Sequence, residues 1–224
     1  MRKVTIVIGP AVGILLTLSL TACSSSTSGG SESTTAGSAA PSTYPPLPTT
    51  TTPAAPEVLI VGDFLTTDTT DLGLQESIAR IGWRSTIDAT EDRTIAEGAD
   101  VLEAADRLGV LPRLIIVSLG TNDACSTSPI ENVEPNIRRI SALAGDEHIV
   151  VWLNLQMKDC VARSRAINDA STVTAMTTPN FFIADWATDA PIQRLGVDGI
   201  RYDLKGRQFR IDYYVSLLRL YATR

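Results

Sequence analysis

Three short polar segments hold the side chains of this chain that could act in catalysis or binding. They contain carboxylates, one carboxamide and one guanidinium. These groups can accept a proton, donate hydrogen bonds to developing negative charge, or hold an anion. The first two segments directly follow apolar runs that have the composition of buried strands. The three segments are Gly62-Asp63-Phe64, Gly120-Thr121-Asn122-Asp123 and Asp198-Gly199-Ile200-Arg201.

Nucleophilic catalysis needs a hydroxyl or thiol beside a base, and these segments offer no such pair. The chain has one histidine, His148, which opens the apolar run 149–155. It therefore belongs at the amino end of a strand, at the sheet edge opposite the three segments. Carboxylates could also hydrolyse a glycoside, but no spacing among them favours this chemistry. The acidic residues in question are Asp63, Asp123, Asp185 and Asp198.

In order and spacing, the three segments resemble the sequence blocks of the SGNH/GDSL hydrolases, and the resemblance covers nearly all of 57–224. In that family the first block reads Gly-Asp-Ser and the last reads Asp-x-x-His. The serine attacks an acyl carbonyl, the histidine takes its proton and the aspartate orients the histidine. By position, Phe64 replaces the serine, Arg201 replaces the histidine and Asp198 is kept. An arginine stays protonated at physiological pH and cannot serve as the base.

The resemblance also implies an oxyanion hole built from the serine amide, a glycine amide and the asparagine side chain. Asn122 is kept, as an oxyanion donor or as a hydrogen-bonding link to neighbouring loops. The glycine position falls at Asp92, whose carboxylate would repel an oxyanion but suits a helix N-terminus. We expect Asp92 and Arg201 to form an ion pair, with Asp63 and Asp198 nearby, that closes the former pocket.

Apolar runs alternate with helical periodicity across 57–224. This alternation predicts an α/β fold, a three-layer α/β/α sandwich with a mostly parallel five-stranded sheet; the resemblance implies the same SGNH-hydrolase-like, flavodoxin-like fold. Ligand sites in such folds lie at the carboxyl ends of the strands. The expected strands are 58–61, 84–88, 114–118, 149–155 and 181–184, and the expected helices are 71–82, 94–108, 130–144, 161–177 and 204–222.

The first 22 residues have the pattern of an export signal, with Arg2 and Lys3 before an apolar stretch. Leu20-Thr21-Ala22-Cys23 resembles a bacterial lipobox, which makes Cys23 the expected lipidation site. The alternative is an ordinary signal peptide with an incidental cysteine. Residues 23–56 then form a lipidated, Ser/Thr/Pro-rich tether that is predicted to be disordered, either a bare spacer or an O-glycosylated one.

The two remaining cysteines, Cys125 and Cys160, each follow a predicted strand. In an exported chain such a pair is expected to form a disulfide that braces the rim of the site. The alternative, Cys125 as a replacement nucleophile, lacks a histidine to activate it. No cofactor or metal site is predicted.

The charge of the chain argues against some partners. It has 19 basic and 25 acidic residues, so removal of Arg2 and Lys3 leaves 17 basic residues and a net charge of about −8. Nucleic acid and anionic headgroups are therefore not expected partners of the domain.

The sequence predicts an extracytoplasmic protein, lipid-anchored to the outer face of the bacterial cell membrane and catalytically inactive. It is expected to bind an envelope glycan, an acyl ligand or a partner protein. The alternatives are an active esterase or acyltransferase that uses non-standard residues, and a structural envelope lipoprotein. An open groove beside Asn122 and Trp186 would favour binding, and an occluded site would favour the structural role. The candidate ligand-binding residues are Asp63, Asn122, Asp123 and Trp186.

Overall fold

One sheet organises the protein, and the computed structural model describes residues 6–7 and 54–222 of the chain. The strand order is β1-β6-β5-β4-β2-β3. Five strands run parallel, as predicted, and the two-residue β1 joins β6 antiparallel. The strands are β1 (Ile6–Val7), β2 (Glu57–Gly62), β3 (Arg84–Ala89), β4 (Leu114–Ser118), β5 (Ile149–Leu153) and β6 (Phe181–Ala184).

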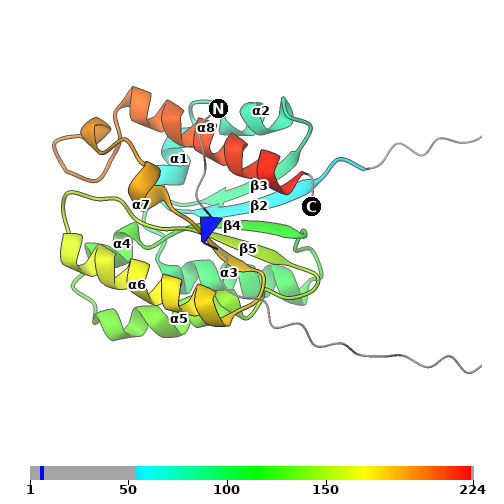
Figure 1. Ribbon diagram of the computed structural model, residues 1–224, viewed down its shortest axis with the longest axis horizontal. Helices are drawn as coiled ribbons and strands as arrows, with labels where there is room; N and C mark the ends of the chain where they lie inside the picture. The colour runs from blue at the N-terminus through cyan, green and yellow to red at the C-terminus, as the bar shows by residue number, and fades with distance from the viewer. Residues whose placement is uncertain (1–5, 8–53, 223–224) are drawn as a thin grey trace, which may run out of the picture. The chain divides into compact units, whose positions relative to one another are not determined.

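Helices cover both faces of the sheet, which completes the predicted three layers (Figure 1). α1 (Phe64–Thr70), α2 (Leu74–Ala79) and α8 (Leu204–Tyr221) cover one face, and α3 (Ile95–Arg107), α5 (Val133–Ser141) and α6 (Val161–Thr177) cover the other. The shorter elements are α4 (Thr121–Ala124), η1 (Ile130–Asn132), α7 (Trp186–Asp189) and η2 (Ile192–Arg194).

The central strands are buried on both faces because their sequences are uninterrupted apolar runs. Every residue of β4 is buried, and its side chains alternate between the two hydrophobic clusters that the helices close. Burial of each such side chain stabilises the fold by about 1.5–3 kcal/mol relative to exposure. Because the five strands run parallel, their carboxyl ends lie at one edge of the sheet, and the loops that carry the polar segments begin there.

The sequence predicted one helix over 71–82, where the structure has the shorter α2, and a further helix, α1, lies directly before this range. α1 was missed because its threonines are poor helix formers by propensity. Asp63 caps its first turn by accepting from the Leu65 amide, and three of the threonine hydroxyls bond to backbone carbonyls one turn earlier. Gly73, at φ +88°, separates α1 from α2.

The predicted lipobox at Cys23 and the tether as far as residue 53 lie outside the described residues. Ile6 and Val7, which form β1, fall within the predicted signal segment. Among the residues that the structure describes, no helix has both the length and the apolar character needed to cross a membrane.

Candidate functional site

Three loops at the carboxyl ends of the strands bring the predicted segments together. β2 ends at Gly62 and leads through Asp63 into α1, and β4 ends at Ser118 and leads through Gly120 into α4. The glycine at 62 is required, because a Cβ there would lie 2.1 Å from the Thr66 hydroxyl. At Gly120 the backbone has φ +111°, a conformation that favours glycine.

The positions assigned to nucleophile and base are in contact, but as a stacked pair. The Arg201 guanidinium carbon lies 4.3 Å from the centroid of the Phe64 ring, a cation–π arrangement. Phe64 is 9 % exposed beneath it. The hydrogen bond to Glu91 is the main cause that raises the pKa of Arg201 above its usual value, with Asp68 adding to it. This pair therefore offers neither a nucleophile nor a proton acceptor.

Arg201 is held by two carboxylates that the sequence did not predict. Its Nη2 is 2.7 Å from Glu91 Oε2 and its Nη1 is 3.3 Å from Asp68 Oδ1. Arg207 Nη2 lies 3.3 Å from the second oxygen of Asp68. The predicted ion-pair cluster of Arg201 with Asp92, Asp63 and Asp198 is wrong, because the carboxylates that pair with Arg201 are those of Glu91 and Asp68.

The reason lies in the turn that connects β3 to α3. The Arg93 amide donates to the Thr90 carbonyl at 3.2 Å, so Glu91 and Asp92 are the central residues of a tight turn. The longer Glu91 side chain reaches Arg201, while Asp92 is exposed. Asp198 Oδ1 accepts hydrogen bonds from the backbone amides of Ile200 and Arg201, within its own loop.

In this structure Asn122 links neighbouring loops by hydrogen bonds, which is one of the two roles that the sequence left open. Its amide nitrogen donates to the Glu91 carbonyl at 3.0 Å and to the Arg93 carbonyl at 2.9 Å. Both amide hydrogens are thus used by the β3–α3 turn, and no hydrogen remains to donate to an oxyanion. The neighbouring Asp123 Oδ2 accepts from the Ile95 amide at 3.0 Å, at the N-terminus of α3. Burial raises the pKa of Asp123.

Two of the four candidate ligand-binding residues are inaccessible. Asp63 is fully buried, and Trp186 is 1 % exposed, with its indole N–H donating to the Tyr202 hydroxyl at 3.1 Å. Neither side chain is open to solvent in this structure, which argues against their assignment as ligand residues. Burial raises the pKa of Asp63 to about 6, although Thr121, Arg210 and the Leu65 amide act in the opposite direction.

A buried polar network behind Asp63 was missed by sequence reasoning. Arg210 is 3 % exposed and donates from Nη2 to Ser118 Oγ at 2.7 Å. Thr66 donates to the same oxygen at 3.1 Å, and its hydroxyl lies 3.2 Å from that of Tyr214. Thr66 is fully buried within this network, so its hydroxyl is not open to a substrate from solvent in this structure.

The Arg210 cation lies over an aromatic face, 4.6 Å from the centroid of the Trp186 ring. Its Nε and Nη1 have no hydrogen-bond partner within the described part of the chain. The sequence signal was a charged residue inside the apolar stripe of α8, one turn before Tyr213 and Tyr214. Stacking against the ring compensates in part for the water that this charge gives up on burial.

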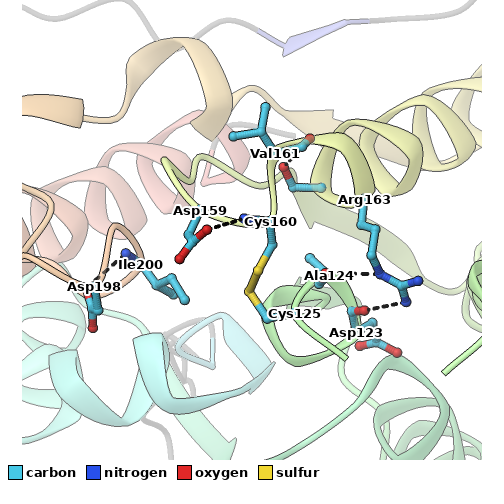
Figure 2. Close-up of a disulfide and its surroundings, with 10 residues drawn as sticks. Asp123, Ala124, Cys125, Asp159, Cys160, Val161, Arg163, Asp198 and Ile200 are labelled. Atoms are coloured by element: carbon cyan, nitrogen blue, oxygen red, sulfur yellow. Dashed lines mark hydrogen bonds between the residues drawn. A yellow bond between two sulfur atoms is a disulfide. The ribbon is translucent and has the colours of Figure 1, made fainter. Parts of the chain in front are cut away.

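The predicted disulfide is present. Cys125 and Cys160 are bonded, with their Cα atoms 5.3 Å apart. Figure 2 shows the bond between the end of α4 and the start of α6, with Arg163 beside it. Arg163 donates to the carbonyls of Asp123 and Ala124 at 2.9 and 3.1 Å. The end of α4 is thus held both by the disulfide and by these two hydrogen bonds. Because Cys125 is oxidised, it is not a free thiol nucleophile.

A polar cavity of about 240 Å³ opens beside this segment. Asp123 and Arg163 line it, together with hydroxyl and amide side chains from α3, α5 and the loop after the disulfide. The polar lining also includes Thr94, Ser126, Ser128, Asn132 and Asn136. Ala96, Pro129 and Val133 complete the lining, so the cavity offers both polar and apolar surface to a ligand. No cluster of His, Cys, Asp and Glu suited to a metal ion occurs among residues 54–222.

No protein-family model and no curated protein sequence matches this chain. Solved structures do match. The C-terminal catalytic domain of Streptococcus pneumoniae peptidoglycan O-acetyltransferase A, with a methylsulfonyl adduct, is 16 % identical, with a TM-score of 0.59, over 75 % of this chain and 92 % of that one. The esterase EstA from Pseudoalteromonas sp. is 14 % identical, with a TM-score of 0.60, over 75 % and 99 %.

A member of the lipolytic G-D-S-L family from Veillonella parvula is 17 % identical, with a TM-score of 0.57, over 73 % of this chain and 97 % of that one. Identities this low establish shared architecture and leave activity to be argued from the site. The domain thus has the fold of the SGNH/GDSL hydrolases.

Proposed function

We propose that this protein is an exported, lipid-anchored member of the SGNH/GDSL fold that does not hydrolyse esters and acts by binding an envelope ligand or a partner protein. The observation that carries the proposal is the stacked contact between Phe64 and Arg201. It fills the reacting position with a ring and a cation, and neither can attack a carbonyl or remove a proton.

The surrounding contacts support the same conclusion. An oxyanion needs unpaired donors at the site, and the Asn122 amide hydrogens are committed to two backbone carbonyls. Arg201 is tied to Glu91 and Asp68, which keeps its charge beside the Phe64 ring. Among these residues the nucleophile and the base are thus missing, and the side-chain oxyanion donor is engaged by backbone carbonyls.

Export and lipid anchoring are proposed from the signal pattern and the lipobox at Cys23. The disulfide between Cys125 and Cys160 is compatible with this proposal, because such bonds persist in oxidising compartments outside the cytosol. The location at the outer face of the cell membrane follows from the lipidation that Cys23 would carry.

For the binding surface we propose the carboxyl edge of the sheet, including the cavity beside Asp123 and Arg163. Its volume of about 240 Å³ is below the range of drug-sized pockets, roughly 300–1,000 Å³. A single sugar unit or a comparable polar group is the class of ligand that fits. One structural neighbour acts on peptidoglycan by its name, which makes envelope glycan the first class to test.

The test is hydrolysis of short-chain aryl esters and acetylated sugars by the mature-length chain, residues 24–224. The wild type is expected to show no turnover above buffer, and no mass increase after incubation with a sulfonyl fluoride that labels activated hydroxyls. The matched comparison is Phe64→Ser with Asp92→Gly and Arg201→His. Turnover or sulfonylation in this triple variant alone would support an inert site on an intact scaffold.

The outcome that contradicts the proposal is turnover by the wild type. If such turnover is lost in Asn122→Ala, with folding verified by circular dichroism, the protein is an esterase that uses this site through other residues. If turnover survives Asn122→Ala, the chemistry lies elsewhere on the molecule.

A further inference from the structure

The outer edge of β6 is paired in this structure by a segment that the proposed processing removes. β1 lies antiparallel to β6, with Ile6 opposite Ala184 and Val7 opposite Ile183. Both residues of β1 precede the lipobox cysteine, Cys23. A chain processed at Cys23 has no β1, and β6 then becomes an edge strand of the sheet.

Backbone hydrogen-bonding groups of β6 point away from the sheet at this edge. The carbonyls of Asn180 and Ala184 accept from Val150 and Asn154, on the β5 side. Since groups alternate along a strand, the N–H and C=O of Ile183 face outward, toward the position that Val7 occupies here. Removal of β1 therefore exposes one donor and one acceptor that are placed to pair with another strand.

The two edges of the sheet differ in how they are protected. β3, at the other edge, carries Arg84 and Asp88, and Arg93 donates to both the carbonyl and the carboxylate of Asp88. Charged side chains of this kind discourage strand addition. β6 reads Phe-Phe-Ile-Ala, without a charge or a proline, and its Phe182 is only half-buried. The β6 edge thus has the composition of a strand that accepts a partner.

We infer that β6 of the mature protein pairs antiparallel with β6 of a second copy. A twofold axis perpendicular to the sheet places identical edges antiparallel, the direction in which β1 pairs here. The same axis puts the two α6 helices in one layer, and α6 carries the exposed apolar side chains Val173 and Met176. This inference rests on the proposed function in two respects: processing at Cys23 would remove β1, and lipid anchoring would concentrate the copies in one plane and favour a weak dimer.

Sedimentation of the mature-length chain, residues 24–224, tests the pairing without depending on lipid, processing or enzymatic activity. A four-residue strand gives a small interface, so dimerisation in the micromolar range or weaker is expected, with the mass rising from one to two chains as concentration rises. A synthetic peptide of residues 3–9, which contains Ile6 and Val7, should reverse it. The same peptide with Val7→Pro, which lacks the central N–H, should not.

Phe182→Lys is expected to abolish the dimer, because it places a charge on a half-buried position of the edge, and the matched change Thr86→Lys on β3 should leave the dimer intact. Thermal unfolding of both variants verifies that they fold. A wild type that stays monomeric at every concentration would overturn the pairing, as would a dimer that survives both Phe182→Lys and the peptide. Neither result would bear on whether the Phe64–Arg201 site is inert.

Discussion

The two sides of the carboxyl edge of the sheet use their polar side chains in different ways. On one side, Asn122 and Asp123 bind backbone, the carbonyls of the β3–α3 turn and the first amide of α3. On the other side, the Arg201 guanidinium contacts side chains, the ring of Phe64 and two carboxylates. The first arrangement fixes the path of loops, and the second fills a space.

This difference separates side chains that hold the loops in place from side chains that only contact one another. A side chain that satisfies backbone groups is difficult to replace, because its loss leaves buried carbonyls or amides without partners. A pair that meets only through side chains can be exchanged together, as a ring and a guanidinium can be for a hydroxyl and an imidazole. We therefore expect substitutions on the Asn122 side to cost stability and those on the Arg201 side to cost little.

The largest effect is expected from the disulfide that braces the Asn122 side. The chain-entropy relation for the 35-residue separation gives a loss of about 4 kcal/mol for Cys125→Ser with Cys160→Ser. Urea unfolding of the double variant measures it, and the wild type under reducing conditions should give the same value. A loss below about 1 kcal/mol would mean that Arg163 alone holds this segment in place.

The next largest effect is the pH dependence of stability that comes from the buried carboxyl of Asp63. Asp63 has a pKa of about 6 in the folded protein against an ordinary 3.8, so the folded state binds this proton more tightly than the unfolded state. Its contribution to stability is therefore fully present below about pH 4 and is lost as the pH rises through about 6, by up to ~3 kcal/mol.

Asp63→Asn should remove that loss, because an amide does not titrate and still accepts the hydrogen bond from the Leu65 amide. The measured quantity is the difference in unfolding free energy between wild type and variant from pH 4 to pH 7. Subtracting the variant cancels Asp123 and other acids whose pKa values are also shifted. A difference that does not change with pH would show that Asp63 is ionised in the fold throughout.

Much of the fold could be predicted from the sequence, because buried parallel strands leave an apolar signature. β4 and β6 have the bounds expected from their composition, and α6 spans 161–177 as its periodicity indicates. The helix that was missed, α1, is formed by residues whose propensity argues against it. Its stability comes from the Asp63 cap and from threonine hydroxyls that bond to the preceding turn, and neither is visible in hydrophobic periodicity.

The site was only partly predictable for a related reason. Sequence position brought Phe64 and Arg201 together, because both follow from the resemblance to one family. It could not decide between Glu91 and Asp92 as the partner of Arg201, since adjacent residues of a turn point in different directions. It also could not show that Trp186 points inward, or that Arg210 on α8 reaches Ser118 on β4.

Asn122→Ala tests the backbone-binding side directly. Two hydrogen bonds to backbone carbonyls are lost, and a decrease of about 2–3 kcal/mol in the free energy of unfolding is expected. Asn136→Ala is the matched control, because that amide donates to one exposed carbonyl, of Asn132, and accepts from Arg139, which keeps its carboxylate partners; a cost of about 1 kcal/mol is expected. Equal effects of the two variants would remove the distinction between the two sides of the edge.

The smallest effect is expected at Arg201, where a double-mutant cycle with Glu91→Gln and Arg201→Gln isolates one ion pair. Both side chains are partly solvated, 39 % and 54 % exposed, so their coupling energy should be under about 1 kcal/mol and should decrease in molar salt. A coupling above about 2 kcal/mol would instead make this pair a rigid part of the scaffold. The two sides of the edge would then differ in chemistry but not in structural importance.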